Sequence, residues 1–431
     1  MATKKLGVGF LGCGVVGSAA AKVLLDASDE LRVRSGAELE LRRVAVRTLS
    51  RARDVELPPE ILTTDPWQVV SDPSVDVVVE VIGGVDPAKD LILAAFKAGK
   101  HVVTANKELI STYGQEVLDA AATHGVDILF EGAVAGGIPI IRPMKESLAG
   151  DRVQRVIGIV NGTTNFILTR MSETGESFTE ALAEAERLGY TELDPSADIE
   201  GYDAAQKVAI LASLAFNARV VASDVHREGI SRVTAADIAA AHELGYEVKL
   251  LAVAEMDDGY VSARVHTAMI PRTHPLAAVR DVFNAVFVEA EHAGQLMFFG
   301  RGAGGGPTAS AVVGDLVEIA RNVVTGGRSP GCTCYHDNAR IRPQDEVKVR
   351  YYVVLSVLDQ PGVLAAVSGV FAGHGISIAS VRQEGFGDEA TLMLITHTAT
   401  EGQHQTTFKE LHDLDAVDKI ESVMRVEGAH E

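Results

Sequence analysis

A glycine pattern near the N-terminus constrains the fold of this chain more than any other feature. The segment Lys5 to Phe10 is expected as a buried parallel strand, and Ser18 to Leu25 as a helix. Between them lies Gly12-Cys13-Gly14-Val15-Val16-Gly17. Gly12 permits a tight turn, Gly14 lets the backbone approach a pyrophosphate, and Gly17 allows helix and strand to pack, while N–H groups around Val15 and Val16 would face the phosphates. The pattern predicts a Rossmann-type nucleotide-binding domain, with a merely glycine-rich turn as the alternative.

The next segments continue the alternation of strand and helix that a doubly wound sheet requires. Ligands of such sheets bind at the carboxyl ends of the strands, so Ile82, Thr104 and Lys107 are expected in the cofactor crevice. The segments are strands at Leu39 to Val46, Asp76 to Ile82, His101 to Thr104 and Asp127 to Phe130, and a helix at Pro87 to Ala98.

The residues after the second strand bear on the choice of cofactor. An enzyme that prefers NAD usually ends this strand with an acid for the ribose hydroxyl. Here Arg47, Arg51 and Arg53 occupy that place, and the arginine fork binds phosphate well. We therefore expect NADP(H) to be preferred over NAD(H), with a solvated basic loop as the alternative.

The stretch from Gly189 to Phe216 is where we expect the chemistry. It begins as a loop rich in acids and turns helical after Gly201, where apolar residues recur at three- and four-residue steps. Asp203 and Lys207 lie four residues apart and share a face of this helix. Because the following turns are apolar, Lys207 should lie where water is scarce, which suits a lysine to proton transfer. An ordinary surface ion pair is the alternative.

A second loop, Glu131 to Pro139, has too few polar side chains for an ordinary exposed turn. Its backbone carbonyls, with the Glu131 carboxylate, could surround a hard cation. This loop is therefore a candidate metal site.

Composition limits the class of protein. The net charge of -20 over 431 residues argues against nucleic acid or an anionic membrane as the main partner. Three cysteines cannot form a disulfide framework, so a cytoplasmic location is expected. Lys4 and Lys5 before an uncharged run resemble a secretory signal, but glycines interrupt that run, and we interpret it as folded structure.

The C-terminal part is expected as a separate unit with βαββαβ order, from Tyr351 to Val426, after a linker at 327–348. The strand followed by Asp359-Gln360-Pro361-Gly362 and a helix resembles the ACT domain, a regulatory module that binds small molecules. The resemblance implies an amino-acid effector near Asp359 and Gly362 and near the turn Gly375 to Ser377.

The motifs taken together resemble homoserine dehydrogenase. In chain order they are the glycine pattern, TANK, EGAVAGGIPI, NGTTNFIL, GYTELDPSADIEGYDAAQK and GRGAGGGPTASAVVGD. The resemblance implies NADPH-dependent, reversible reduction of L-aspartate 4-semialdehyde to L-homoserine in threonine, methionine and isoleucine biosynthesis.

The resemblance also implies roles for single residues. Lys207 would donate the proton, and Lys107 would be a second catalytic lysine near the nicotinamide. Glu192 and Asp203 would hold the substrate ammonium, with Asp194 beside them, while Gly189 and Gly304 would approach the cofactor. Sodium or potassium would be bound by Glu131, Val134, Gly136 and Ile138.

The predicted architecture is α/β with three domains. They are a discontinuous Rossmann-type domain (1–135 and about 305–326), an α+β mixed-sheet domain for substrate and dimerisation (136–304), and a ferredoxin-like ACT domain (349–431). A homodimer or homotetramer is expected, with threonine as a candidate effector. The alternatives are a hydroxyacid dehydrogenase with an ACT tail and a non-catalytic sensor of nucleotide and amino acid.

Overall fold

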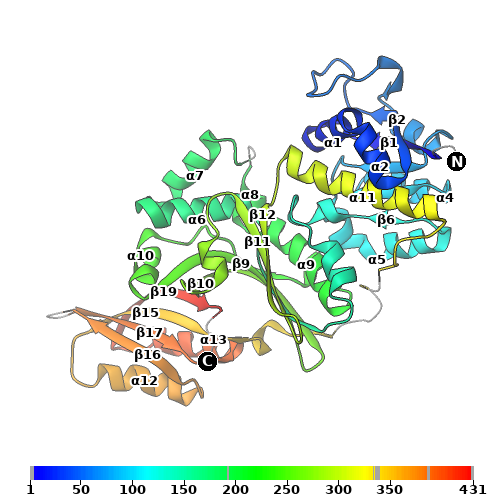
Figure 1. Cartoon of the computed structure of the whole chain (residues 1–431). Helices are drawn as coiled ribbons and strands as arrows, with labels where there is room; N and C mark the ends of the chain where they lie inside the picture. Colours follow the sequence, from blue (N-terminus) through cyan, green and yellow to red (C-terminus); the bar gives the residue numbers. More distant parts are fainter. Residues whose placement is uncertain (1–3, 192–193, 333, 335–339, 386–388, 429–431) are drawn as a thin grey trace. The chain divides into compact units, whose positions relative to one another are not determined.

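The computed structural model describes residues 4–191, 194–332, 334, 340–385 and 389–428. The chain forms two compact units, each assembled from separate segments (Figure 1). Both units are therefore discontinuous, and the predicted domain boundaries stay a prediction. Unit 1 comprises Met1–Gly162, Asp203–Val225 and Val282–Ala339, and unit 2 comprises Thr163–Tyr202, His226–Asp281 and Arg340–Glu431.

Unit 1 contains a six-stranded parallel sheet in the order β3-β2-β1-β4-β5-β6. The strand order reverses beside β1, which is the switch point where Rossmann sheets bind dinucleotides. Residues Leu6 to Leu11 of β1 are buried, as expected for a parallel strand covered on both faces. The strands are β1 Lys4–Leu11, β2 Ala37–Ala45, β3 Leu62–Thr63, β4 Val77–Glu80, β5 His101–Thr104 and β6 Ile128–Leu129.

Helix α11 returns to this sheet from late in the sequence. Its Val312 and Leu316 belong to the same buried core as Val8 and Phe10 of β1, and the yellow α11 runs beside the blue α1 (Figure 1). The prediction of a discontinuous nucleotide-binding domain is thus confirmed. The helices of this part are α1 Val15–Asp26, α2 Ser28–Ser35, α3 Trp67–Ser71, α4 Ala88–Lys97, α5 Lys107–His124 and α11 Gly305–Thr325.

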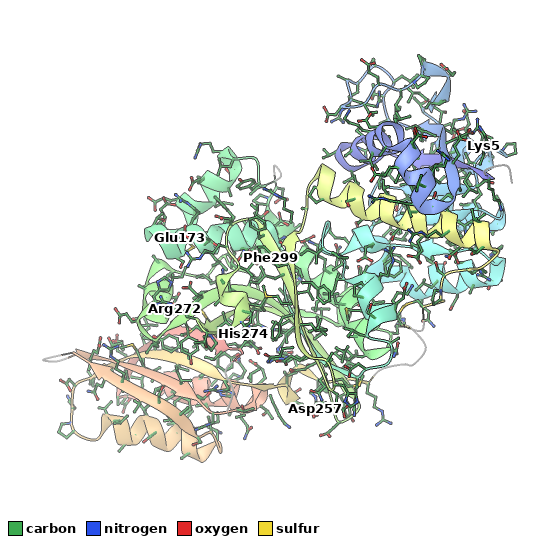
Figure 2. All side chains as sticks on the ribbon, viewed as in Figure 1. Lys5, Glu173, Asp257, Arg272, His274 and Phe299 are labelled. Carbon is green, nitrogen blue, oxygen red and sulfur yellow. A yellow bond between two sulfur atoms is a disulfide. The ribbon has the colours of Figure 1, made fainter. Side chains whose placement is uncertain are left out.

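Unit 1 also contains three antiparallel strands in the order β12-β11-β7, together with most of helix α9 (Tyr202–Phe216). Strand β12 alternates between exposed and half-buried side chains, and Phe299, labelled in Figure 2, is 55% exposed. These strands are β7 Val153–Ile159, β11 Phe283–Ala290 and β12 Gly294–Arg301.

Unit 2 combines a long hairpin with the C-terminal module. Strands β9 and β10 pair antiparallel, and β10 pairs in parallel with β19, the last strand of the chain. The elements before the module are α6 Gly162–Thr174, α7 Phe178–Arg187, α8 Ser196–Ile199, β8 His226–Arg227, α10 Ala235–Glu243, β9 Tyr246–Asp257 and β10 Tyr260–Pro271.

The module has the βαββαβ order that the sequence predicts, with an antiparallel sheet in the order β19-β15-β17-β16. Its core joins Val353 and Leu355 of β15 to Val367 and Phe371 of α12. The elements are β15 Tyr351–Leu358, α12 Val363–Gly373, β16 Ile378–Glu384, β17 Glu389–Thr396, β18 Ala399–Thr400, α13 Glu401–His412 and β19 Val417–Val426.

Part of the segment expected as a linker is ordered. Strand β13 (Arg340–Ile341) pairs with β10, and β14 (Lys348–Val349) pairs with β18. Arg342 donates to the backbone carbonyl of Asp257, labelled in Figure 2, at 2.7 Å. The approach to the module is therefore fastened to the β9–β10 hairpin. Cys332 and Cys334 are joined by a disulfide, which the sequence analysis did not anticipate.

Two expected elements differ from the structure. The sequence predicts the last helix from Thr406 to Leu414, but it begins at Glu401, because Thr400 and Gln403 form a capping box there. The acidic loop contains a short helix, α8, where only loop was expected. In the described part of the chain, no helix is both long and apolar enough to cross a membrane.

Candidate active site

The three glycines of the turn after β1 have different environments. Gly12 has φ of +102°, and a Cβ there would lie 2.9 Å from the Val81 carbonyl oxygen. A Cβ at Gly17 would lie 2.4 Å from the Gly12 carbonyl oxygen, so that position also excludes a side chain. Gly14, the N-cap of α1, has an ordinary φ of −81° and open space around its Cα. The fold itself therefore requires Gly12 and Gly17, whereas the space beside Gly14 is open.

A second helix begins next to this turn. Gly304, with φ of +115°, is the N-cap of the 21-residue α11. A Cβ on the following residue, Gly305, would lie 3.0 Å from the Val15 side chain and 3.2 Å from the Val15 carbonyl oxygen. Two helix N-termini thus lie side by side, and both favour an anion. Gly305, directly after Gly304, therefore lies beside Val15, and the approach of Gly304 to the cofactor stays a prediction.

The carboxyl ends of β4 and β5 are organised by Glu80, a residue that the sequence analysis missed. Its carboxylate accepts the N–H groups of Ile82 and Gly83, at 2.9 and 3.1 Å, and the Thr104 hydroxyl at 2.6 Å. Burial raises the pKa of Glu80. The signal available in the sequence was an acid inside an otherwise apolar strand.

Glu80 thereby fixes two predicted cofactor residues. Ile82 is held through its amide, and the Thr104 side chain is directed into the protein, where its oxygen also accepts the Asn106 N–H at 3.0 Å. Asn106 in turn caps α5, the helix that begins with Lys107. Thr104 therefore shapes the crevice through this network.

The arginine-bearing loop follows β2. Arg47 and Arg51 are exposed. Arg53 stabilises the loop itself, because its guanidinium donates to the backbone carbonyls of Thr48, Leu49 and Arg51. Arg53 therefore holds the loop that presents the other two arginines.

Three segments of unit 1 meet at the carboxylate of Asp203. Lys207 Nζ lies 2.6 Å from Asp203 Oδ2, and Lys107 Nζ lies 3.2 Å from Oδ1. Asn161, which follows β7, donates its amide to Oδ2 at 2.9 Å. Lys207 also donates to the Val160 carbonyl at 2.7 Å. The two lysines expected to be catalytic are thus brought to one carboxylate.

Asp203 is well suited to hold two cations. Burial opposes its ionisation, but the charges of Lys207 and Lys107 and the hydrogen bonds from Lys207 and Asn161 outweigh it and lower the pKa to about 2. The carboxylate is therefore ionised throughout the neutral range. Lys207 is 8% exposed, whereas the Lys107 side chain is 41% exposed. Lys207 is the sequestered lysine and Lys107 the accessible one.

Asn161 was part of a motif that the sequence analysis singled out, but it was given no role. Its amide orients the carboxylate that orients Lys207. The available signal was an asparagine directly after a buried strand, at a carboxyl end where polar side chains gather.

The acidic loop belongs to unit 2, apart from Asp203. Gly189 has φ of +73° and ends the turn after α7, and the carbonyl of Tyr190 accepts the Thr163 hydroxyl at 2.8 Å. Asp194 is exposed, and its carboxylate accepts the N–H and hydroxyl of Ser196. Glu192 lies outside the described residues. The substrate-binding roles of Glu192 and Asp194 stay predictions.

The loop after β6 gives Glu131 a role that the sequence analysis did not name. Its carboxylate accepts the N–H groups of Ile140, Ile141 and Arg142 at 2.7 to 2.9 Å. The carboxylate therefore holds the following helical turn, and its contact with a cation stays a prediction. Within the described ranges, no group of three or more His, Cys, Asp or Glu side chains could hold a metal ion.

The backbone of this loop is tightly constrained. Ala135 and Gly136 both have positive φ, +53° and +49°. A Cβ at Gly136 would lie 2.6 Å from the Gly302 carbonyl oxygen, and the Gly137 N–H donates to the Arg301 carbonyl. The loop is therefore fixed against the segment that leads to Gly304.

Comparison with known proteins gives three family matches. Residues 12–131 match the homoserine dehydrogenase NAD-binding domain, residues 139–317 match homoserine dehydrogenase, and residues 351–416 match the ACT domain. Together these matches extend over most of the chain.

Whole proteins agree with the domain matches. A homoserine dehydrogenase of Mycobacterium tuberculosis is 51% identical over 99% of this chain and 98% of its own length. The crystal structure of a homoserine dehydrogenase from Thiobacillus denitrificans has a TM-score of 0.93 and 41% identity, covering 99% of both chains. A hyperthermophilic archaeal homoserine dehydrogenase in complex with NADPH has a TM-score of 0.63 and 28% identity, covering 76% of this chain and 99% of its own.

The glycine turn yields a paired prediction. Gly14→Ala should leave the thermal unfolding temperature within a few degrees of the original, because its Cβ meets only open space, but should weaken dinucleotide binding at least tenfold. Gly17→Ala should destabilise the protein by about 1–3 kcal/mol, because its Cβ overlaps the Gly12 carbonyl. Calorimetric titration with NADPH and thermal unfolding would measure both. Equal binding by the Gly14→Ala variant would exclude the turn as the pyrophosphate site.

Proposed function

The chain belongs to the homoserine dehydrogenase family, and from that premise we propose a role for each residue of its active site. Lys207 donates the proton to the oxygen of the substrate aldehyde. The bound nicotinamide supplies hydride to the carbonyl carbon. The observation that carries this proposal is the contact of buried Lys207 with ionised Asp203, which keeps a cationic proton donor in place at a poorly solvated site.

Lys107 assists as the accessible lysine. It begins α5 directly after the carboxyl end of β5, where a Rossmann sheet meets its cofactor. Its ammonium lies on the oxygen of Asp203 that Lys207 does not bind. A cation there stabilises negative charge as it develops on the substrate oxygen.

Acidic side chains bind the amino group of the substrate in this proposal. We assign Glu192, Asp194 and Asp203 to this role, with Gly189 close to the cofactor. Asp203 has a double task, because the same carboxylate binds the lysines. Oδ2 accepts from both Lys207 and Asn161, whereas Oδ1 has a lone-pair direction beyond its contact with Lys107, so an ammonium is accommodated there without releasing Lys207.

NADP(H) is the proposed cofactor. Exposed Arg47 and Arg51 follow β2, where the ribose 2′-phosphate of NADP lies in such sheets. The fit is supported by the open side of Gly14 and by the two adjacent helix N-termini. The archaeal relative bound to NADPH adds support from outside this chain.

A monovalent cation, sodium or potassium, is proposed for the loop after β6. The donors would be the backbone carbonyls of Glu131, Val134, Gly136 and Ile138, since the Glu131 carboxylate already accepts three backbone N–H groups. Neutral backbone oxygens of a buried loop suit a singly charged hard cation. Its role would be structural, because the loop packs against the segment before Gly304.

The remaining proposals concern regulation, assembly and location. We assign the ACT module an amino-acid effector such as threonine, near Asp359, Gly362 and the turn at Gly375. Exposed Met297 and Phe299 on the edge strand β12 support a homodimer or homotetramer. A cytoplasmic location is proposed because the family is biosynthetic.

The role of Lys207 is tested by Lys207→Met, which keeps the length and apolar stem of the side chain. The catalytic rate should fall by on the order of a hundred- to ten-thousandfold, the usual scale for a general acid. The Michaelis constant for aspartate semialdehyde should change much less. The matched control is Lys249→Met on β9, because Lys249 is also a buried lysine but binds Asn165 and the Val279 carbonyl. Near-normal turnover of folded Lys207→Met would leave Lys107 as the proton donor.

Cofactor choice is tested by Arg47→Ala and Arg51→Ala. Loss of a hydrogen bond to phosphate, worth about 1.5–3 kcal/mol, should lower the preference for NADPH over NADH by roughly ten- to a hundredfold. Arg42→Ala is the control, because Arg42 is an exposed arginine that pairs with Glu40 within β2. The ratio of kcat/KM for the two cofactors is the measurement. Equal use of NADH and NADPH by the unaltered chain would contradict the assignment.

The cation is tested by exchanging the buffer ion. Sodium or potassium should raise the thermal unfolding temperature and activity relative to tetramethylammonium, which is too large for a carbonyl ring. Gly136→Ala should abolish the difference between the ions, because its Cβ meets the Gly302 carbonyl, while Gly150→Ala, in open space, should keep it. Indifference of the unaltered protein to the ion would remove the site.

A further inference from the structure

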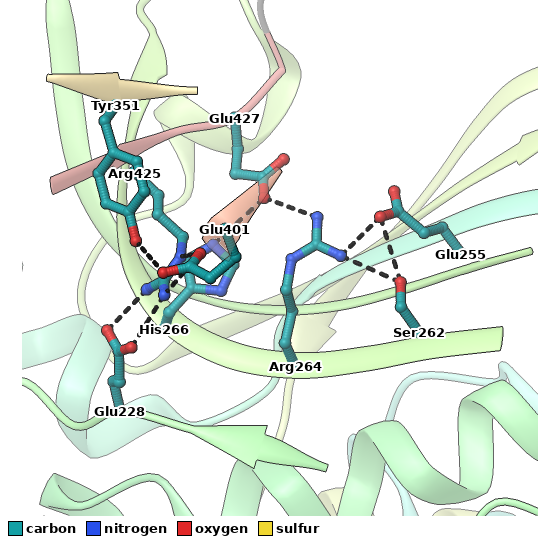
Figure 3. Close-up of polar contacts among 9 residues, drawn as sticks. All are labelled: Glu228, Glu255, Ser262, Arg264, His266, Tyr351, Glu401, Arg425 and Glu427. Atoms are coloured by element: carbon teal, nitrogen blue, oxygen red, sulfur yellow. Dashed lines mark hydrogen bonds and ion pairs between the residues drawn. The ribbon is translucent and has the colours of Figure 1, made fainter. Parts of the chain in front are cut away.

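The ACT module is joined to the rest of unit 2 by a buried network of charges (Figure 3). Strand β19 pairs in parallel with β10, with Arg425 opposite Ala268. The Arg425 side chain, only 4% exposed, binds Glu228 in a two-pronged arrangement at 2.7 and 2.9 Å. It also donates to Glu401 at 3.2 and 3.3 Å. One guanidinium thus joins a residue of the module to a residue outside it.

Within the ACT module, the network extends toward the turn Gly375 to Ser377, where an effector is expected (the effector turn). Glu401 is the first residue of α13, and its carboxylate also accepts the Tyr351 hydroxyl at 2.7 Å. Two residues later on the same helix, Gln403 donates to the His374 carbonyl at 3.0 Å. His374 directly precedes the turn that begins at Gly375. The N-terminal turn of α13 therefore contacts Arg425 and the effector turn at once.

The other side of the network leads to the acidic loop. Next to Glu228, the Arg227 guanidinium donates to the Glu200 carbonyl and covers the Tyr202 ring at 3.3 Å. Gly229 packs so closely that a Cβ would lie 2.2 Å from the Ile199 carbonyl oxygen. Arg227 and Gly229 therefore contact the end of the acidic loop, while Glu228, which lies between them in the chain, binds Arg425.

The end of the acidic loop leads directly into helix α9. Tyr202 is the first residue of the helix that carries Asp203 and Lys207. Residues 199–202 are therefore joined directly, along the chain, to the residue that binds Lys207. A buried guanidinium shared by two carboxylates also has restricted geometry, because the arginine fork matches a carboxylate in one plane.

A second charged cluster lies beside the first. Arg264 donates to Glu255 at 2.6 Å and to Glu427 at 3.0 Å, and His266 lies 3.2 Å from Glu427. These contacts fasten the residue after β19 to the hairpin. Val265, between Arg264 and His266, accepts the Glu228 N–H at 2.7 Å, so both clusters adjoin the segment at Glu228.

We propose that Arg425 is a positioning residue that couples the ACT module to the acidic loop, with Glu401 as its contact on the module and Glu228 as its contact toward the loop. The proposal rests on the assignment of the acidic loop and α9 to substrate binding and proton transfer. Loss of either contact loosens residues 199–202 and weakens substrate binding, while Lys207 itself remains able to donate its proton.

The test is a double-mutant cycle on the full-length protein with Glu228→Gln, Glu401→Gln and the double variant. Both substitutions keep side-chain shape and remove charge, and Glu228 is half-exposed, so its variant should fold. Each single change should raise the Michaelis constant for aspartate semialdehyde about three- to tenfold, with kcat within twofold. Because both act through Arg425, the double variant should be no worse than the worse single one.

Hydrogen exchange provides a reading that does not depend on the substrate. Amides of residues 199–202, and the Ile230 amide that binds the Ile199 carbonyl, should exchange at least fivefold faster in both single variants. Arg425→Lys should restore part of the protection relative to Arg425→Gln. The control is Glu421→Gln, which breaks an exposed pair with Lys419 on the same strand and should change neither reading.

The outcomes separate this coupling from the assignment of the active site. Unchanged exchange at residues 199–202 in Glu401→Gln, or additive effects in the cycle, would overturn the coupling whatever Lys207→Met does. Faster exchange with an unchanged Michaelis constant would confirm the mechanical link and overturn its effect on substrate binding. If an Arg425 variant does not fold, the Glu228 and Glu401 variants decide alone.

Discussion

The ionised carboxylate of Asp203 is the interaction on which the candidate active site depends. It joins α9, the start of α5 and the residue after β7 through Lys207, Lys107 and Asn161. Removing one partner of a buried ion pair typically costs about 3–5 kcal/mol, because the other charge is left without compensation. Among the described residues, two lysines share this one carboxylate. The interaction that holds the three segments together therefore also fixes the positions of both lysines.

Local patterns made much of this arrangement predictable. The glycine turn is fixed by contacts within a few residues, and the sequence therefore predicts both its strand and its helix. The four-residue spacing of Asp203 and Lys207 likewise places them on one helical face. Glu80, in contrast, acts by joining the ends of two strands, and its contact with Thr104 depends on the order of strands in the sheet. An acid in an apolar strand signals such a role but does not name the partner.

Glu131 makes contacts within the chain that its sequence context does not reveal. An acid before a loop poor in polar side chains suggested a carboxylate ligand for a cation. In the structure the same acid satisfies three amide N–H groups at the start of the next helical turn, which would otherwise be unpaired. The Glu131 carboxylate accepts these N–H groups, which lie nine to eleven residues later in the chain. The backbone carbonyls remain the donors best suited to a monovalent cation.

Arg425 extends the same reasoning to the C-terminal module. Nothing in the sequence around it, at the end of a strand, distinguishes it from a surface arginine. Its significance comes from the parallel pairing of β19 with β10, which brings Arg425 to Glu228 although 197 residues separate them. Burying a guanidinium there is costly, and apolar side chains of similar size would often hold two sheets together as well. A charge placed between the ACT module and the segment at Glu228 is therefore better explained by the restricted geometry it imposes than by stability alone.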